Sequence, residues 1–416
     1  MKSIFNPLLK LGFQKISDLL NSSNNWLQNQ LFAQLAGSGD IIVGADNNGL
    51  LKKLNINNFY FDATVGIGGQ YATVNLAQAA GKFILKQVNN IIETSSVYLD
   101  NRTIIVNQNA SYNWTFSGIE TFLVVADNNK IIGCNIINNL RTSGGIVGRN
   151  EVTGKNSIIV PEFQYCSFVF TGGAALTSTY NIYINFRYCK ITLGNAYWAG
   201  LAYAGYVAFT NFYNCYITGG GTSCHINSTQ GDIIGCVINA VVSAGSSTLS
   251  ARDILDTQIL STTMSVTATR RIDNVYSNSP LICNSGAGWG SEDAKVSNSS
   301  FPNIAGYNVP LFKIIDSLTF TGATTFYSTN SNLNNCQFKS TLSIINKNNN
   351  IDAVFSGNVS IAGTANSTKI TGKCLGSLTL APGVANCDIN VGIASAANII
   401  DNSGNLTNRI SYYLLT

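Results

Sequence analysis

A six-residue pattern recurs through the middle of this chain. It consists of an apolar residue, two mostly polar or small residues, a cysteine, any residue, and then Ile or Phe. The six copies span residues 131–136, 163–168, 186–191, 212–217, 233–238 and 333–338, and weaker copies carry Thr257, Val275 and Ser299 in the cysteine slot. From slot to slot the steps are 32, 23, 26, 21, 21, 18, 24 and 37 residues. Most of these steps are close to one coil of a right-handed parallel β-helix, so the repeat predicts an all-β solenoid.

The cysteine slot is defined by side-chain volume. It accepts Cys, Thr, Val and Ser, which are all small or β-branched, as expected where like side chains stack inside a narrow coil. The first, fourth and sixth positions of the pattern cannot all face inward on a flat strand, because successive side chains alternate between its two faces. All three can face inward only if the strand bends or bulges within the pattern.

A second column of residues supports the same register. Four residues before the slot stand Asn185, Asn211, Asp232 and Asp253 in successive copies, with Glu162 before them and Asn332 later. Asn and Asp tolerate left-handed backbone and bond neighbouring amides, so we expect this column at a sharp turn entering a strand. Stacked at the strand spacing of about 4.8 Å, these side chains would form an amide ladder.

The composition agrees with a solenoid and excludes several classes of protein. Charged residues make up only 11% of the chain and there are 6 Pro in 416 residues, which suits strands that must all donate to a ladder. A net charge of +4 is too weak to predict a nucleic-acid partner. No apolar stretch is long enough to insert into a membrane, and no convincing signal-peptide cleavage site follows the N-terminus.

The 10 cysteines and the single His do not have the spacing of a metal site, so neither a metal nor a cofactor is expected. Six of the cysteines occupy equivalent slots in the repeat. We therefore expect reduced, buried thiols and assembly in a reducing cytoplasm.

The N-terminal segment, residues 1–36, has the pattern of an amphipathic helix. Asn6 is a suitable cap and Pro7 suits the first helical position. The apolar positions that follow at helical spacing are Leu9, Phe13, Ile16, Leu20, Leu27 and Leu31. An apolar stripe of this kind needs a partner, so the segment is predicted to dock on another protein or to oligomerise. The alternative is a helix folded back on its own solenoid.

Residues 37–58 read as a hairpin linker, in which Asn48-Gly49 is a two-residue turn signal between two apolar strands. The run from Gly39 to Leu54 resembles segments near the N-termini of bacteriophage tail-fibre and other virion appendage proteins. Residues 59–110, with Thr73 as the cap of a short helix, are similar to the capping helix and first coils of pectate-lyase-like and phage tailspike β-helices. Residues 111–345 would then be the β-helix shaft.

The repeat pattern is lost after residue 346. Short apolar strands alternate there with Gly-rich turns, notably at Ala381-Pro-Gly383. We expect a small β tip or end-cap over residues 346–416, with thin terminal coils as the alternative.

Tailspikes of this shape often cleave bacterial polysaccharide with paired carboxylates, so the resemblance makes Asp232 and Asp253 candidate catalytic residues. Glycoside hydrolysis needs two carboxyl groups about 5 to 9.5 Å apart, and one coil step would place this pair near the short end. Their column also contains Asn185 and Asn211, so a structural role accounts for both without chemistry. The sequence does not require an enzyme.

Large aromatic residues lie among glycines in two of the longer connections. They are Tyr197, Trp198, Tyr203, Tyr206 and Trp289. Rings held in loops are candidate contacts for a sugar or a protein. The alternatives are a loop packing its own ring down and an interface between protomers.

These observations predict a structural and adhesive fibre or spike subunit of a bacteriophage particle, with the virion as its location. It would form a homotrimer, attach to head or tail proteins through its N-terminus, and bind a host cell-surface glycan or protein. One alternative is a polysaccharide-degrading tailspike of the same fold. Another is a bacterial surface adhesin, which the missing signal peptide and the unpaired cysteines disfavour.

Overall fold

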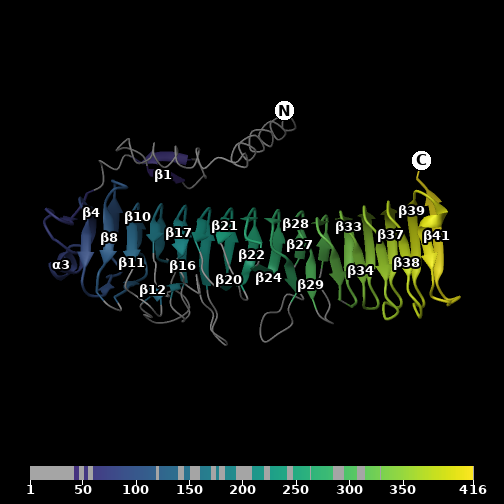
Figure 1. Cartoon of the computed structure of the whole chain (residues 1–416). Helices are drawn as coiled ribbons and strands as arrows, with labels where there is room; N and C mark the ends of the chain where they lie inside the picture. The colour runs from purple at the N-terminus through teal and green to yellow at the C-terminus, as the bar shows by residue number, and fades with distance from the viewer. Residues whose placement is uncertain are drawn as a thin grey trace, which may run out of the picture.

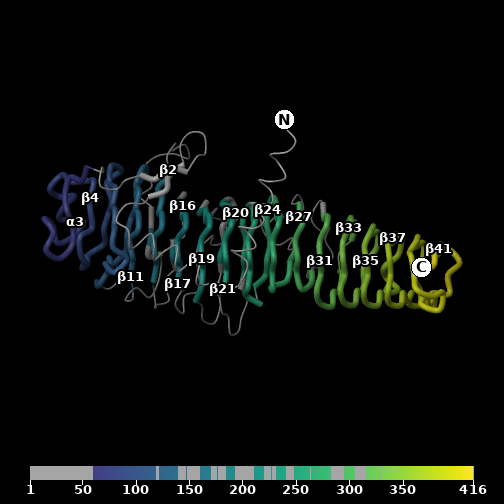
Figure 2. The backbone as a smooth tube through the Cα atoms, turned by 90° about the horizontal axis from the view of Figure 1, so that it is seen from above, coloured from purple at the N-terminus to yellow at the C-terminus, as the bar shows by residue number. Residues whose placement is uncertain are grey.

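The chain forms an elongated parallel β-solenoid in a computed structural model (Figure 1). The structure describes residues 42–45, 51–54, 60–118, 121–138, 145–149, 160–169, 175–177, 183–193, 209–219, 225–240, 247–262, 264–283, 295–306, 314–327 and 329–415. Seen from above, the coils follow one another along a single axis in sequence order (Figure 2). The all-β parallel solenoid predicted from the repeat is thus confirmed.

Most coils contribute strands to three columns, and each strand pairs in parallel with its equivalent in the next coil. The first column contains β3 (Ala63–Val65), β4 (Ile84–Gln87), β7 (Ile104–Asn107), β10 (Lys130–Ile132), β13 (Glu162–Gln164), β16 (Tyr183–Arg187), β18 (Phe209–Tyr213), β20 (His225–Ile234), β22 (Ser247–Leu255), β24 (Met264–Asp273), β27 (Lys295–Ser297), β30 (Ile314–Asp316), β33 (Asn332–Phe338), β35 (Asn350–Phe355), β37 (Lys369–Cys374), β39 (Asp388–Ile393) and β41 (Arg409–Leu414).

The second column lies just after the bend in each coil. It contains β5 (Ile91–Glu93), β8 (Asn113–Phe116), β11 (Asn135–Asn138), β14 (Ser167–Val169), β17 (Lys190–Leu193), β19 (Tyr216–Gly219), β21 (Val237–Ala240), β23 (Gln258–Ile259), β25 (Tyr276–Ser277), β28 (Ser300–Phe301) and β31 (Thr319–Phe320), and it merges into β33.

The third column closes the coil. Its strands are β6 (Val97–Tyr98), β9 (Leu123–Val125), β12 (Gly145–Arg149) and β15 (Ala175–Thr177), then the first halves of β20, β22 and β24, then β26 (Leu281–Cys283), β29 (Ile304–Gly306), β32 (Thr324–Phe326), β34 (Leu342–Ile344), β36 (Val359–Ile361), β38 (Leu378–Leu380) and β40 (Ile399–Asp401). A short 3₁₀ turn, η2 (Ala396–Asn398), precedes β40.

The expected bend is a single residue with left-handed backbone directly before the slot. In Gly133, Tyr165, Tyr188, Asn214, Gly235, Asp256, Asn274, Asn298, Ser317 and Asn335, φ lies between +47° and +70°. This residue ends the first-column strand and turns the chain into the second. The first, fourth and sixth residues of the pattern all point inward as a result, as Phe212, Cys215 and Ile217 show with exposures of 0, 2 and 0%.

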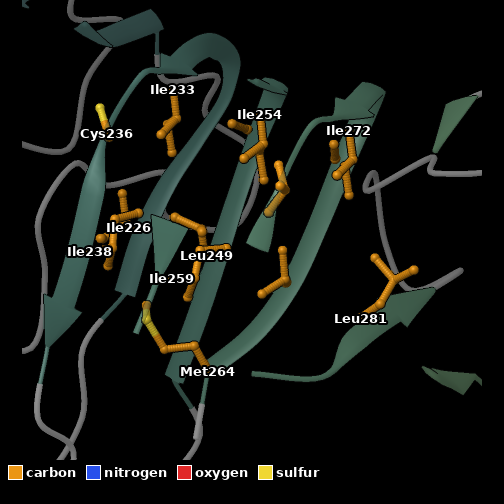
Figure 3. Close-up of a cluster of buried hydrophobic side chains, with 14 of the residues drawn as sticks. Ile226, Ile233, Cys236, Ile238, Leu249, Ile254, Ile259, Met264, Ile272 and Leu281 are labelled. Atoms are coloured by element: carbon orange, nitrogen blue, oxygen red, sulfur yellow. The ribbon is translucent and has the colours of Figure 1, made fainter. Parts of the chain in front are cut away.

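The cysteine slot is a continuous buried file. Cys189, Cys215 and Cys236 are each at most 2% exposed, and Cys236 lies among the inward-facing Ile233 and Ile238 (Figure 3). Each thiol donates to the carbonyl of the first pattern residue in the preceding coil, at 3.4 Å for Cys215 to Phe186. Eight cysteines are free and buried, as predicted: Cys134, Cys166, Cys189, Cys215, Cys236, Cys336, Cys374 and Cys387.

One coil was not recognised from the sequence pattern. Residues 315–320 form a further copy with Leu318 in the slot, 1% exposed, and Ile315 pairs with Val296 and Leu333 on either side. Leu318 divides the anomalous 37-residue step into steps of 19 and 18 residues. The slot steps therefore vary between 18 and 32 residues, while the strand register stays the same.

The parallel pairing continues across residue 346, so residues 350–414 form further coils and not a separate β tip. Leu333, Ile351, Ile370, Ile389 and Ile410 are register partners from β33 to β41. In these coils the left-handed residue precedes the first-column strand, as at Asn348, Ser367 and Asn386. The register shifts after Leu333, and β35 buries Ile351, Ala353 and Phe355 at every second position. A pattern that requires the bend cannot detect them.

The Asn and Asp residues four positions before the slot are aligned as predicted, but they occupy a different part of the coil from the one expected. Asn185, Asn211, Asp232 and Asp253 lie inside β16, β18, β20 and β22 and not at turns. The ladder itself forms, because Asn211 Nδ2 donates to Asn185 Oδ1 at 2.8 Å, and Asn211 Oδ1 accepts from the Asp232 N–H at 2.8 Å.

The N-terminal end of the solenoid carries a short helix, α3 (Val74–Ala79), as predicted. Thr73 caps it, with its Oγ1 accepting from Leu76 N at 3.2 Å. The expected hairpin is also present: β1 (Ile42–Ala45) and β2 (Leu51–Leu54) pair antiparallel. The predicted Asn48-Gly49 turn lies outside the described residues. The predicted helix over residues 1–36 lies outside the described residues.

The bend can be tested at Asn214, where φ is +53°. Replacement by Val should destabilise the protein by about 1–2 kcal/mol, because a β-branched residue is strained in left-handed backbone. Replacement by Gly, which adopts this conformation freely, should have little effect. Thermal unfolding of both variants measures the difference, and equal losses would show that the backbone conformation is not the constraint.

Candidate functional site

Only two of the residues singled out as functional candidates fall within the described part of the chain. Tyr197, Trp198, Tyr203, Tyr206 and Trp289 lie outside it, as do Leu9, Phe13, Ile16, Leu20, Leu27 and Leu31. Asp232 and Asp253 lie within it and form the centre of the candidate site.

Asp232 and Asp253 are direct register partners on β20 and β22. The Cα atoms of such a pair are separated by about one strand spacing, 4.8 Å, as the sequence predicted. Asp232 is 8% exposed and Asp253 is 2% exposed. The two carboxylates thus lie side by side in the sheet and are largely buried.

Each carboxylate is engaged by an arginine from the following coil. Arg252 donates to Asp232 Oδ1 from Nε at 2.9 Å and to Oδ2 from Nη2 at 2.6 Å. Arg270 donates to Asp253 Oδ1 from Nε at 2.7 Å and to Oδ2 from Nη2. This forked contact raises the pKa of Arg270. Arg271 adds a longer contact, 4.0 Å from Nη2 to Asp253 Oδ2.

Neither Arg252 nor Arg270 bonds the carboxylate that is nearest to it in sequence. Arg252 lies next to Asp253 in sequence but bonds Asp232, and Arg270 lies near Asp273 but bonds Asp253. The local cause is an irregular register: the pairing shifts before Asp232 in β20 and before Asp253 in β22, so simple alternation does not hold there, and stacked coils bring residues about 20 apart together.

The arginines occupy the carboxylate oxygens that an acid/base pair would have to present to a substrate. Bidentate guanidinium–carboxylate bonds are strong and fix both partners in one geometry. The chemistry that this arrangement performs best is therefore to tie three successive coils together. This is a structural role rather than a hydrolytic one.

A second cluster, which the sequence reasoning missed, lies on earlier strands of the same column, β13, β16 and β18. Arg187 bonds Glu162 and lies over the ring of Tyr213 at 4.2 Å. One residue along, Tyr165 and Tyr188 stack with ring centroids 5.0 Å apart. The available signal was the repeated Gln-Tyr-Cys and Arg-Tyr-Cys before two successive slots.

The tyrosines of this cluster are suited to hydrogen bonding and ring contacts. Burial, and then the neighbouring Tyr188, raise the pKa of Tyr165. Burial, and then the charge of Asp232, raise the pKa of Tyr213. Both phenols thus keep their protons at neutral pH and remain donors. Half-exposed rings beside fixed polar groups are able to contact a sugar or a protein surface.

Two properties of the described residues bear on the site. They contain no group of three or more His, Cys, Asp or Glu side chains that could hold a metal ion. They also contain no helix long and apolar enough to cross a membrane.

Comparison with protein-family models, with curated proteins and with solved structures found no match to this chain.

The arginine pairing predicts that Asp253 supports stability. Asp253→Asn should lower the free energy of unfolding by about 2 kcal/mol, because it weakens a buried charged contact between coils. Asp388→Asn, an exposed carboxylate in the same first column, is the matched control and should change little. Chemical denaturation measures both, and a neutral Asp253→Asn variant would contradict the structural role.

Proposed function

We propose that this chain is a structural and adhesive subunit of a bacteriophage particle. It would be a fibre or spike that attaches through its N-terminal segment and presents the solenoid to the host surface. The winding of the coils would be right-handed, as is almost universal for parallel crossover connections.

The observation that carries the proposal is the unbroken parallel ladder from Ala63 in β3 to Leu414 in β41. Each coil is hydrogen-bonded to the next along the whole axis, which makes a stiff spacer. A rod of this kind suits the presentation of a binding surface at a distance from its point of attachment. The sequence resemblance around the β1–β2 hairpin supports a virion appendage as the setting.

The cluster of Glu162, Tyr165, Arg187, Tyr188 and Tyr213 favours an adhesive role for the described surface. Rings, a guanidinium and a carboxylate on one rigid sheet match the polar and apolar parts of a host glycan or protein. Several copies per particle would multiply a weak contact into firm attachment. A homotrimer is the proposed arrangement of the subunit.

The polysaccharide-degrading tailspike remains the second candidate, because Asp232 and Asp253 are adjacent in register. Their arginine contacts weigh against it. The two candidates make opposite predictions for capsular polysaccharide from strains to which the protein adheres.

We expect the protein to bind this polysaccharide without releasing reducing ends. Tyr188→Ala should weaken binding about three- to tenfold through the loss of one ring contact. Tyr276→Ala, an exposed tyrosine on β25 that is 52% accessible, serves as the control. Reducing ends that appear with the wild type and vanish in Asp232→Asn would establish the enzymatic candidate instead.

Docking is tested by deleting residues 1–36. The truncated protein should keep the solenoid, because its described coils begin at residue 60, and should no longer be incorporated into particles. Circular dichroism and particle pull-down measure the two properties. Incorporation of the truncated protein would contradict the docking role, and a full-length chain that stays monomeric at micromolar concentration in light scattering would contradict the trimer.

A further inference from the structure

A single carboxyl group is buried beneath the helix at the N-terminal end of the solenoid. Glu93 ends β5 and is 1% exposed. Its Oε1 accepts a hydrogen bond of 2.7 Å from Val74 N, in the first turn of α3. The side chain therefore joins α3 to the first coils directly.

Among the described residues, no cation forms an ion pair with this carboxyl group. The described elements around it are α3, β3, β5, β6 and β8, and their other titratable side chain is Tyr98, which is 58% exposed on β6. The β8 residues at this level are the buried Trp114 and Phe116. An ionised carboxylate in such surroundings is costly, since it has lost its water and gained no opposite charge. Burial accordingly raises the pKa of Glu93 to about 7, although the Val74 N–H partly offsets it.

The other contacts of α3 do not depend on pH in this range. Gln78 Nε2 donates to Tyr98 O at 3.1 Å, and Gln78 Oε1 accepts from Asp100 N at 2.8 Å. Asn75 Nδ2 donates to Ser96 O at 3.2 Å. The Asp100 carboxyl group bonds Arg102, which lowers its pKa and moves its titration further into the acid range.

We propose that α3 is a pH-sensitive cap, which the protonated Glu93 side chain holds closed and which opens as this carboxyl group ionises. The inference is independent of the proposed function.

The direction follows from the two states of the cap. In the open state Glu93 reaches water and titrates near its ordinary pKa of 4.5, whereas in the closed state it titrates at about 7. The closed state therefore holds its proton over the interval between these values, and its advantage is complete below pH 4.5. The open fraction should rise with pH from 4.5 and level off above about 7.

Hydrogen exchange by mass spectrometry on the full-length protein tests the proposal. After correction for the intrinsic pH dependence of exchange, opening of the segment containing α3 should increase on the order of 50-fold between pH 5 and pH 8. The amides of β37 (Lys369–Cys374), far along the solenoid, should show no such change. A corrected rate in α3 that is constant with pH would overturn the proposal.

Glu93→Gln is the decisive variant, because its amide oxygen is still able to accept the Val74 N–H but does not titrate. We expect its corrected exchange in α3 to be independent of pH, and retention of the wild-type pH profile would overturn the proposal. Should this variant fail to fold, infrared difference spectroscopy of the wild type provides a second measurement. A buried carboxyl group that titrates near neutrality supports the cap, and the absence of one titrating above pH 5.5 contradicts it.

Discussion

The structure depends on backbone hydrogen bonds between strands that are parallel and in register from one coil to the next. Once two coils are paired in this way, every side chain lies over the side chain at the equivalent position about one strand spacing away. Small thiols stack on thiols, Phe163 stacks on Phe186 and Phe186 on Phe212 with nearly parallel rings, and amides bond amides. The interior is thus one narrow column of repeated contacts rather than a core assembled from distant elements.

The left-handed residue before the slot explains both the success and the limits of sequence reasoning. Where the bend is present, it fixes inward positions at the first, fourth and sixth residues, and the cysteine spacing reveals the coil. Leu318 was missed because a larger residue occupies the slot. The C-terminal coils were missed because their left-handed residue lies before the first-column strand, which then keeps ordinary alternation, as Ile389, Val391 and Ile393 illustrate. Regular alternation is common to most β-strands, so it does not distinguish a solenoid coil.

The sequence predicted which residues of the candidate site are aligned with each other, but not which residues they contact. The alignment of Asp232 with Asp253 could be read from spacing alone. The identity of their partners could not, because Arg252 and Arg270 reach back to the preceding coil at a point where the strand register is irregular. Glu93 gave no signal at all, since the short run Ile91-Ile92-Glu93 does not indicate that its last side chain is buried under a helix. The ring and guanidinium cluster around Arg187 could have been found by stacking the copies of the pattern and reading the columns before the slot.

In most domains the length of a connection and the packing of the interior depend on each other. In this solenoid the slot steps vary while the interior stays the same. A connection that lengthens from 21 to 32 residues between slots leaves the pairing of the flanking strands unchanged. Insertions and deletions outside the strands therefore need no compensating change in the interior. Such a scaffold lets mutation alter the outer contour of the molecule rapidly while the file of inward residues remains under constant selection, which is an advantage to any protein that must follow a changing counterpart.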